Sequence, residues 1–229
     1  MKISLILLLL YVTACGGRER QGASETEGVS ESASVVASAV RGASAGVLFL
    51  GTSLTAGYGI DPDSSYPAVI QRKIDLAQLD RHYVVRNAGL SGETSAGALR
   101  RIYWLLNDPF DIVVIETGAN DGLRGLNADS TGANIEGIIA AVRARQPGAR
   151  MLLAGMEAPV NLGLEYTARF RAVFTEVASR NKVVLIPFLL DGVAGVDTLN
   201  QSDGIHPNEA GARIVAENVW RVLRGMLNE

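Results

Sequence analysis

Thiols, imidazoles and long apolar runs are scarce in this chain of 229 residues. It has one cysteine, Cys15, and two histidines, and its formal net charge is −3. Beyond Cys15 no thiol is available for a disulfide, a metal site or nucleophilic catalysis, and the histidines lack zinc-ligand spacing. The lack of a basic excess argues against nucleic-acid binding. No apolar run reaches the roughly 18–20 residues of a membrane-spanning helix. We predict no metal, no organic cofactor and no nucleic-acid partner.

The N-terminal residues have the pattern of a leader that is removed rather than of a folded domain. Lys2 precedes an apolar stretch at residues 3–11, and small residues then precede Cys15. This pattern resembles a bacterial lipobox, although the usual Leu three residues before the cysteine is Val12 here. We predict a lipoprotein signal peptide at residues 1–14 and a lipid on Cys15. The alternative is an ordinary signal peptide with an incidental cysteine.

Residues 16–45 are rich in Gly, Ala, Ser and Glu and contain no aromatic residue. Such a segment buries too little apolar surface to offset the entropy lost on ordering. We therefore predict that residues 15–45 comprise the lipidated cysteine and a flexible tether. A lipid at Cys15 would make the protein a membrane-anchored lipoprotein of the cell envelope, facing the periplasm or the exterior.

Residues 46–229 are predicted to form one domain in which strands alternate with helices. Five short, β-rich apolar runs are typical of strands buried on both faces of a parallel sheet. They lie at residues 47–50, 83–85, 112–115, 151–154 and 183–186. Apolar residues recur at helical spacing in four later segments. These segments lie within residues 98–106, 135–142, 170–177 and 215–226.

This alternation predicts an α/β fold, a three-layer α/β/α domain with a five-stranded, mainly parallel sheet and right-handed crossovers. Sites in such sheets lie beyond the carboxyl ends of the strands. The polar motifs of the chain follow several of these ends. We expect them to converge at one edge.

Three residues have the chemistry of a nucleophile, a base and an orienting carboxylate. Ser53 lies just after the first strand, where its Oγ could face a substrate; the alternative is a helix N-cap. Asp203 precedes His206 by three residues, so its carboxylate can reach Nδ1 and leave Nε2 to accept a proton. The alternative is an incidental pair in a surface loop. His82, at a polar helix-to-strand join, is expected to be solvated.

Two further residues could stabilise negative charge on a substrate oxygen. Asn120 follows the third strand in a Gly-rich segment, where a side-chain amide can donate to an oxyanion. Its alternative is a left-handed turn residue. Gly92 follows the second strand, and the lack of a Cβ lets a carbonyl oxygen approach its N–H. Its alternative is a plain loop glycine.

Four motifs in this order make the chain similar to SGNH (GDSL) hydrolases, especially the bacterial branch of arylesterases, thioesterases and lysophospholipases. The motifs are GTSLTAG at residues 51–57, NAGLSGET at 87–94, ETGANDGLRG at 116–125 and DGIHP at 203–207. The similarity spans essentially the whole domain. The segment at residues 156–163 matches a substrate-side loop of the family only loosely.

The resemblance implies a flavodoxin-like fold and a role for each candidate residue. Ser53 would be the nucleophile, His206 the base and Asp203 the residue that orients it. The oxyanion hole would consist of the N–H groups of Ser53 and Gly92 and the Asn120 side chain. One departure is Thr52, where the family usually has Asp.

The implied activity is metal-free hydrolysis of carboxylic esters through an acyl-enzyme. Arylesterase, lysophospholipase and thioesterase share this mechanism, and the sequence does not separate them. The predicted partners are a small-molecule or lipid ester and a membrane contacted through the lipid anchor. One alternative is a carbohydrate O-acetylesterase, which would need an open groove. Another is a non-catalytic binding lipoprotein on a hydrolase scaffold.

Overall fold

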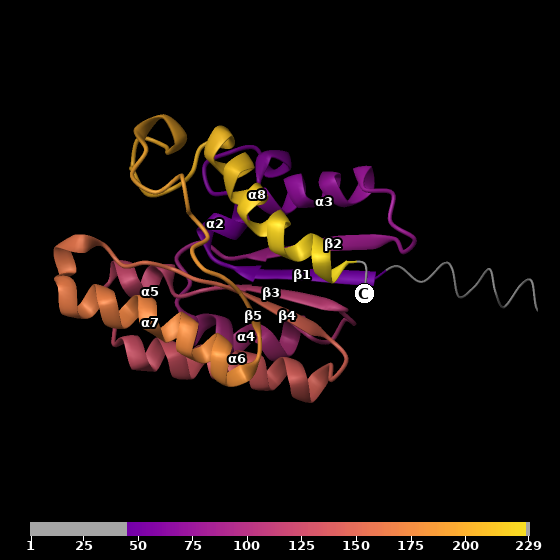
Figure 1. Ribbon diagram of the computed structural model, residues 1–229, viewed down its shortest axis with the longest axis horizontal. Coiled ribbons are helices and arrows are strands. Elements are labelled where there is room, and N and C mark those ends of the chain that lie inside the picture. The colour runs from indigo at the N-terminus through magenta and orange to yellow at the C-terminus, as the bar shows by residue number, and fades with distance from the viewer. Residues whose placement is uncertain (1–44, 228–229) are drawn as a thin grey trace, which may run out of the picture. The chain divides into compact units, whose positions relative to one another are not determined.

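The computed structural model describes residues 45–227, and within them five strands form one parallel sheet in the order β2-β1-β3-β4-β5 (Figure 1). Neighbouring strands are parallel in every pair. The strands are β1 (Ala45–Gly51), β2 (Tyr83–Gly89), β3 (Ile112–Glu116), β4 (Arg150–Ala154) and β5 (Val184–Ile186). The predicted sheet is confirmed. The predictions for residues 1–44, including the leader, Cys15 and the tether, lie outside the described residues and stay predictions.

Helices cover both faces of the sheet and complete the three predicted layers (Figure 1). One layer holds α3 (Tyr66–Leu76) and α8 (Glu209–Met226). The other holds α4 (Ser95–Leu105), α6 (Ala128–Arg145) and α7 (Leu164–Asn181). The four predicted helical segments correspond to α4, α6, α7 and α8. Between residues 45 and 227, no helix is long and apolar enough to cross a bilayer.

Short helical turns lie in the loops and were not apparent from periodicity, because they have too few residues to show it. They are α2 (Ser53–Ala56), η1 (Pro62–Ser64), α5 (Ala119–Leu123), η2 (Val160–Leu162) and η3 (Asp197–Leu199). α2 directly follows β1, and α5 follows β3. Both therefore lie at the carboxyl edge of the sheet, where the sequence places its polar motifs.

The centre of the sheet is fully buried, which fixes the ends of the strands relative to one another. Residues 47–50 of β1 and 112–115 of β3 have no exposed surface. In the register, Gly51 pairs with Gly89, and Leu50 lies opposite Ile115. β1 thus lies between β2 and β3, at the point where the strand order reverses. Ligand sites of doubly wound sheets form at this point.

Candidate active site

Ser53 is the first residue of α2, and its hydroxyl faces the imidazole of His206. The Ser53 Oγ lies 2.9 Å from the His206 Nε2. The N-cap of α2 is Thr52, whose side chain accepts from the N–H of Leu54. The alternative that Ser53 is an N-cap is therefore wrong, because its neighbour fills that position and leaves the Ser53 hydroxyl to the histidine.

Asp203 holds the opposite side of the same imidazole. Its Oδ2 lies 2.6 Å from the His206 Nδ1, and its Oδ1 accepts from the backbone N–H groups of Ile205 and His206 at 2.9 and 3.0 Å. The backbone N–H and then the side chain of His206 are the main causes that lower the pKa of Asp203 to about 2. An ionised carboxylate at Nδ1 retains the proton there, so Nε2 is the nitrogen that accepts from Ser53.

Tyr58 and Gln201 brace the segment that carries His206. The Tyr58 ring lies 4.7 Å from the imidazole, centroid to centroid. The side-chain amide of Gln201 donates to the carbonyl oxygens of Tyr58 and Pro207, at 2.7 and 3.1 Å. The two loops are separated by more than 140 residues in the sequence. These contacts limit how far the imidazole can turn away from Ser53.

Gly92 and Asn120 lie beside Ser53 and line the same cleft. Gly92 has φ of +79°, a conformation that favours glycine. Its carbonyl accepts from Arg124 Nη2 at 3.0 Å. Within residues 45–227, the N–H groups of Ser53 and Gly92 have no hydrogen-bond acceptor in the protein. They are thus available to a substrate oxygen in the cleft.

Asn120 lies in the first turn of α5 and not in a left-handed turn, as its alternative supposed. The left-handed residue is Gly118, with φ of +92°. The Asn120 Nδ2 donates to the Glu93 carbonyl at 3.0 Å. An amide nitrogen carries two protons, so this contact orients the group and leaves a second proton to donate.

A buried ion pair fixes the loop that carries Gly92. Glu93 receives two hydrogen bonds from Arg101 Nε and one from Nη2, at 2.7 to 2.9 Å. The same guanidinium donates to the carbonyls of Gly51 and Ala88 at the ends of β1 and β2. A bidentate pair of this kind is geometrically specific. The loop is therefore tied to the strands that position Ser53.

A second buried carboxylate, Glu116, lies behind Ser53 at the end of β3. Its oxygens accept from the Thr52 N–H at 2.6 Å, from the Thr52 hydroxyl at 2.9 Å and from the Thr55 hydroxyl at 2.8 Å. Thr55 in turn contacts the hydroxyl of Tyr66 at 2.7 Å. Burial is the largest effect on the pKa of Glu116 and raises it. A Cβ at Gly51 would lie 1.8 Å from Thr55 Oγ1, so only glycine leaves room for this cluster.

The cleft around these groups has a volume of about 890 Å³ and is lined mainly by apolar side chains. Its apolar lining comes from four loops beyond the carboxyl edge of the sheet. It includes Leu54, Leu123, Met156, Val160, Phe188, Leu190 and Ile205. Ser53 and His206 lie in the same cleft. The cleft therefore brings an apolar surface to a nucleophile and a base.

No three His, Cys, Asp or Glu side chains in residues 45–227 are arranged to hold a metal ion. His82 is exposed, as expected. The predicted residues Ser53, Gly92, Asn120, Asp203 and His206 are brought together.

Sequence reasoning missed the residues that support this site, because each acts through a contact between distant segments. They are Tyr58, Glu93, Arg101, Glu116, Arg124 and Gln201. Glu93, Glu116 and Arg124 lie within the four motifs, so their position was a signal. Tyr58, Arg101 and Gln201 lie outside the motifs and carried no signal of their contacts.

The fold and this arrangement of groups define an SGNH-type hydrolase. Residues 49–214 match the GDSL-like lipase/acylhydrolase family model, and the chain belongs to this family. It is a hydrolase of ester bonds.

Named relatives and solved structures agree with this assignment. The chain is 41% identical over 182 residues to "Esterase TesA" of Pseudomonas aeruginosa, covering 79% of this chain and 89% of the relative. It is 33% identical over 183 residues to "Thioesterase 1/protease 1/lysophospholipase L1" of Escherichia coli, covering 80% and 85%. A crystal structure of TesA matches with a TM-score of 0.75 and 39% identity, covering 80% of this chain and 99% of that one.

Proposed function

We propose that the chain hydrolyses carboxylic esters through an acyl-enzyme formed on Ser53. The observation that carries the proposal is the contact of 2.9 Å between Ser53 Oγ and His206 Nε2, with Asp203 on the opposite nitrogen. Ser53 and His206 share one cleft with Gly92 and Asn120. The nucleophile, the base and the oxyanion donors are thus within reach of one carbonyl, and the orienting carboxylate contacts the opposite side of the base.

In acylation, Ser53 Oγ attacks the carbonyl carbon of the ester while His206 Nε2 takes the hydroxyl proton. The carbonyl oxygen becomes an oxyanion that faces the N–H groups of Ser53 and Gly92 and the amide of Asn120. Asp203 stabilises the imidazolium without taking its proton. The bond to the leaving oxygen then breaks, and His206 gives its proton to the departing alcohol.

Deacylation repeats these steps with water as the nucleophile. His206 Nε2 takes a proton from water as the water oxygen attacks the acyl carbon. The bond to Ser53 Oγ breaks, His206 returns the proton to this oxygen, and a carboxylic acid leaves. No metal or organic cofactor enters the sequence of steps, because the imidazole and the oxyanion donors supply the acid, base and electrostatic functions.

The cleft favours esters with an apolar acyl or aryl group. Its apolar walls suit a hydrocarbon group better than a carbohydrate, for which more polar groups would be expected. The relatives' names include arylesterase and lysophospholipase. We therefore place aryl and lipid esters ahead of acetylated carbohydrate. A thioester would use the same steps.

The leader extends the proposal to location. A lipid on Cys15 would anchor the enzyme to a membrane of the cell envelope, facing the periplasm or the exterior. The support is the lipobox-like sequence before Cys15 and the polar segment after it. A site outside the cytoplasm favours lipid or aryl esters over acyl-coenzyme A.

A panel of p-nitrophenyl esters, from acetyl to palmitoyl, tests the activity. We expect hydrolysis by the wild-type protein and none above background by Ser53→Ala. An organophosphonate should add a single adduct to the peptide that contains Ser53. Labelling of another residue, or labelling that persists in Ser53→Ala, would remove this assignment.

A further inference from the structure

Exposed apolar side chains are concentrated around the mouth of the cleft. Nine large ones lie in the loops and helix ends beyond the carboxyl edge of the sheet. They are Tyr58, Leu90, Leu123, Leu126, Val160, Leu162, Leu164, Val196 and Ile205. Single exposed apolar residues are normal on protein surfaces. A group of them around one opening is not, and it marks a surface that contacts something apolar.

Five of these side chains do not line the cleft, and we call Leu90, Leu126, Leu162, Leu164 and Val196 the outer rim. They come from four segments: β2 to α4, α5 to α6, the end of η2 with the start of α7, and β5 to α8. Each rim residue lies within three positions in the sequence of a residue that lines the cleft, namely Ser91, Leu123, Asn161 or Gly195. The outer rim therefore lies next to the cleft, and Leu162 and Leu164 also line a neighbouring hollow. Leu164 is 89% exposed, so packing within the domain does not explain it.

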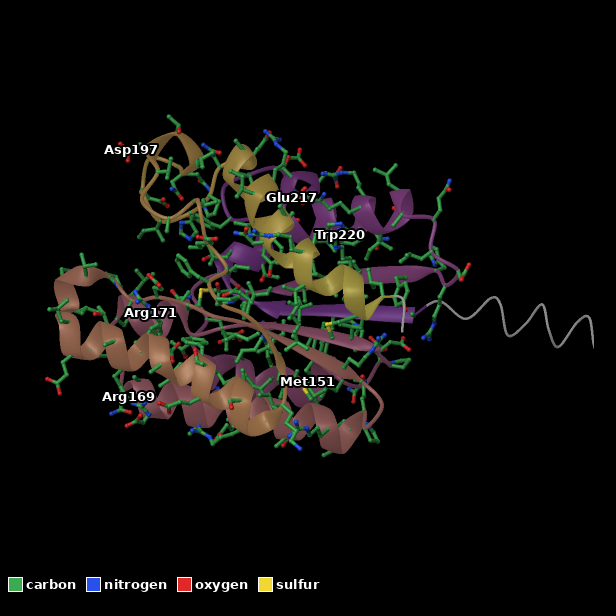
Figure 2. The ribbon with its side chains drawn as sticks, viewed as in Figure 1. Met151, Arg169, Arg171, Asp197, Glu217 and Trp220 are labelled. Carbon is green, nitrogen blue, oxygen red and sulfur yellow. The ribbon has the colours of Figure 1, made fainter. Side chains whose placement is uncertain are left out.

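Two lobes carry part of the rim, the segment between β5 and α8 and the start of α7, and both lie at the same end of the domain (Figure 2). Figure 2 shows Asp197, next to Val196, at the tip of the segment between β5 and α8, and Arg171 on α7, which begins at Leu164. Trp220 and Met151 lie farther toward the other end of the domain (Figure 2). A flat apolar surface could thus contact both lobes at once.

The charges near the rim distinguish between kinds of lipid surface. The rim connections carry exposed acidic residues, including Glu165, Asp191 and Asp197. Two basic residues lie near the rim and both have partners. The Arg124 guanidinium donates to the Gly92 carbonyl, and Arg169, which lines the same hollow as Leu164, is paired with Asp129 and Glu176. An anionic membrane would repel such a surface, whereas a zwitterionic one would not. The rim fits a zwitterionic lipid surface.

We propose that the outer rim docks the cleft onto a zwitterionic lipid surface, so that a lipid ester passes from that surface into the cleft. This inference rests on the proposed esterase function. An anchor at Cys15 does not prevent this orientation, because about 30 residues separate it from β1 and an extended chain of that length spans up to about 100 Å.

Two substrates separate docking from chemistry in the full-length protein. The first is p-nitrophenyl butyrate, monomeric in water. The second is p-nitrophenyl palmitate in phosphatidylcholine vesicles. The test variant is Leu164→Ser. The matched control is Leu76→Ser, because Leu76 is 82% exposed at the far end of α3. Any lipid anchor is the same in all variants, so it does not contribute to the difference.

We expect Leu164→Ser to lower the rate on vesicles by about tenfold, as for a leucine that leaves water on docking. Adding Leu126→Ser should lower it further. Both variants should keep the wild-type rate on butyrate, and Leu76→Ser should behave as wild type on both substrates. Replacing phosphatidylcholine with phosphatidylglycerol should slow the wild-type protein.

Three results would overturn the docking proposal while leaving the esterase function intact. They are an unchanged vesicle rate in the double variant, an equal loss in Leu76→Ser, and a faster rate on phosphatidylglycerol. A wild-type protein that hydrolyses neither substrate would instead refute the proposed function. Circular dichroism of each variant confirms that the exposed substitutions leave the fold unchanged.

Discussion

Replacing Glu116 with alanine should both destabilise the domain and slow hydrolysis. The Glu116 carboxylate is fully buried and accepts from three donors, the Thr52 N–H and the hydroxyls of Thr52 and Thr55. Thr52 immediately precedes Ser53 in the sequence. The cluster therefore fixes the turn from which the Ser53 hydroxyl and N–H face the cleft.

The hydrogen bonds lost in Glu116→Ala determine how strongly the substitution destabilises the domain. Each buried donor that loses its acceptor costs about 1–3 kcal/mol. Three donors lose theirs in Glu116→Ala, while the cost of burying a carboxylate disappears. We expect a net loss of about 3 kcal/mol in the free energy of unfolding. A displacement of Ser53 by a fraction of an ångström should lower kcat by about 10- to 100-fold, with a smaller change in KM.

Glu116→Gln is the matched variant, because it keeps the shape and one oxygen acceptor. We expect its unfolding free energy to lie within about 1 kcal/mol of wild type and its kcat to be largely retained. The pH dependence of stability should differ between wild type and Glu116→Gln. The pKa of Glu116 is raised by burial. Its stabilising contribution is therefore complete below the ordinary pKa and is lost as the pH rises through the raised value. Glu116→Gln has no titrating group at this position, so its stability should not fall with rising pH for this reason.

Urea denaturation followed by circular dichroism measures the stabilities, and p-nitrophenyl butyrate hydrolysis measures kcat and KM. Measurements at increasing pH above the ordinary glutamate pKa should show wild type losing stability relative to Glu116→Gln. The reasoning fails if Glu116→Ala is as stable and as active as wild type. It also fails if Glu116→Gln is impaired as severely as the alanine variant, because shape and acceptors would then not matter.

Further predictions concern the catalytic groups and the anchor. Asp203→Asn should lower kcat by about 10⁴, because an amide facing Nδ1 favours the wrong tautomer of His206; a folded variant with normal kcat would contradict this. The stability of Asp203→Asn should also fall less than that of wild type between about pH 4 and pH 2. In wild type, the lowered pKa of Asp203 stabilises the fold at pH values above the ordinary aspartate pKa, and this stabilisation is lost as the pH falls through about 2. Asn120→Ala should lower kcat by about 10²–10³ with little change in KM, and near-normal kcat would mean that other groups bind the oxyanion. Cys15→Ala should abolish fatty-acid labelling and release the protein from the membrane fraction; an unlabelled, freely soluble wild-type protein would exclude the anchor. Exhaustive chelation should leave activity unchanged, and activity restored only by added metal would refute the metal-free mechanism.

The sequence alone predicted the sheet, because its strands are continuous apolar runs and their burial is a local property of composition. Residues 47–50 and 112–115 were among the runs predicted as strands buried on both faces, and they are fully buried. The Asp203–His206 pair was also local, because three residues separate its members and one turn brings them together. The motifs then indicated which strand ends carry the polar groups.

Only the tertiary structure decided how these groups meet. Ser53 and His206 are far apart in the sequence, and packing of the segment between β5 and α8 against the segment after β1 places one opposite the other. Short helices such as α5 have too few residues to show a helical period in the sequence. Asn120 was therefore expected in a turn, whereas the structure places it in the first turn of α5. The Glu116 cluster and the outer rim depend on which loops become neighbours. Contacts of this kind follow from packing between segments, and no local pattern encodes them.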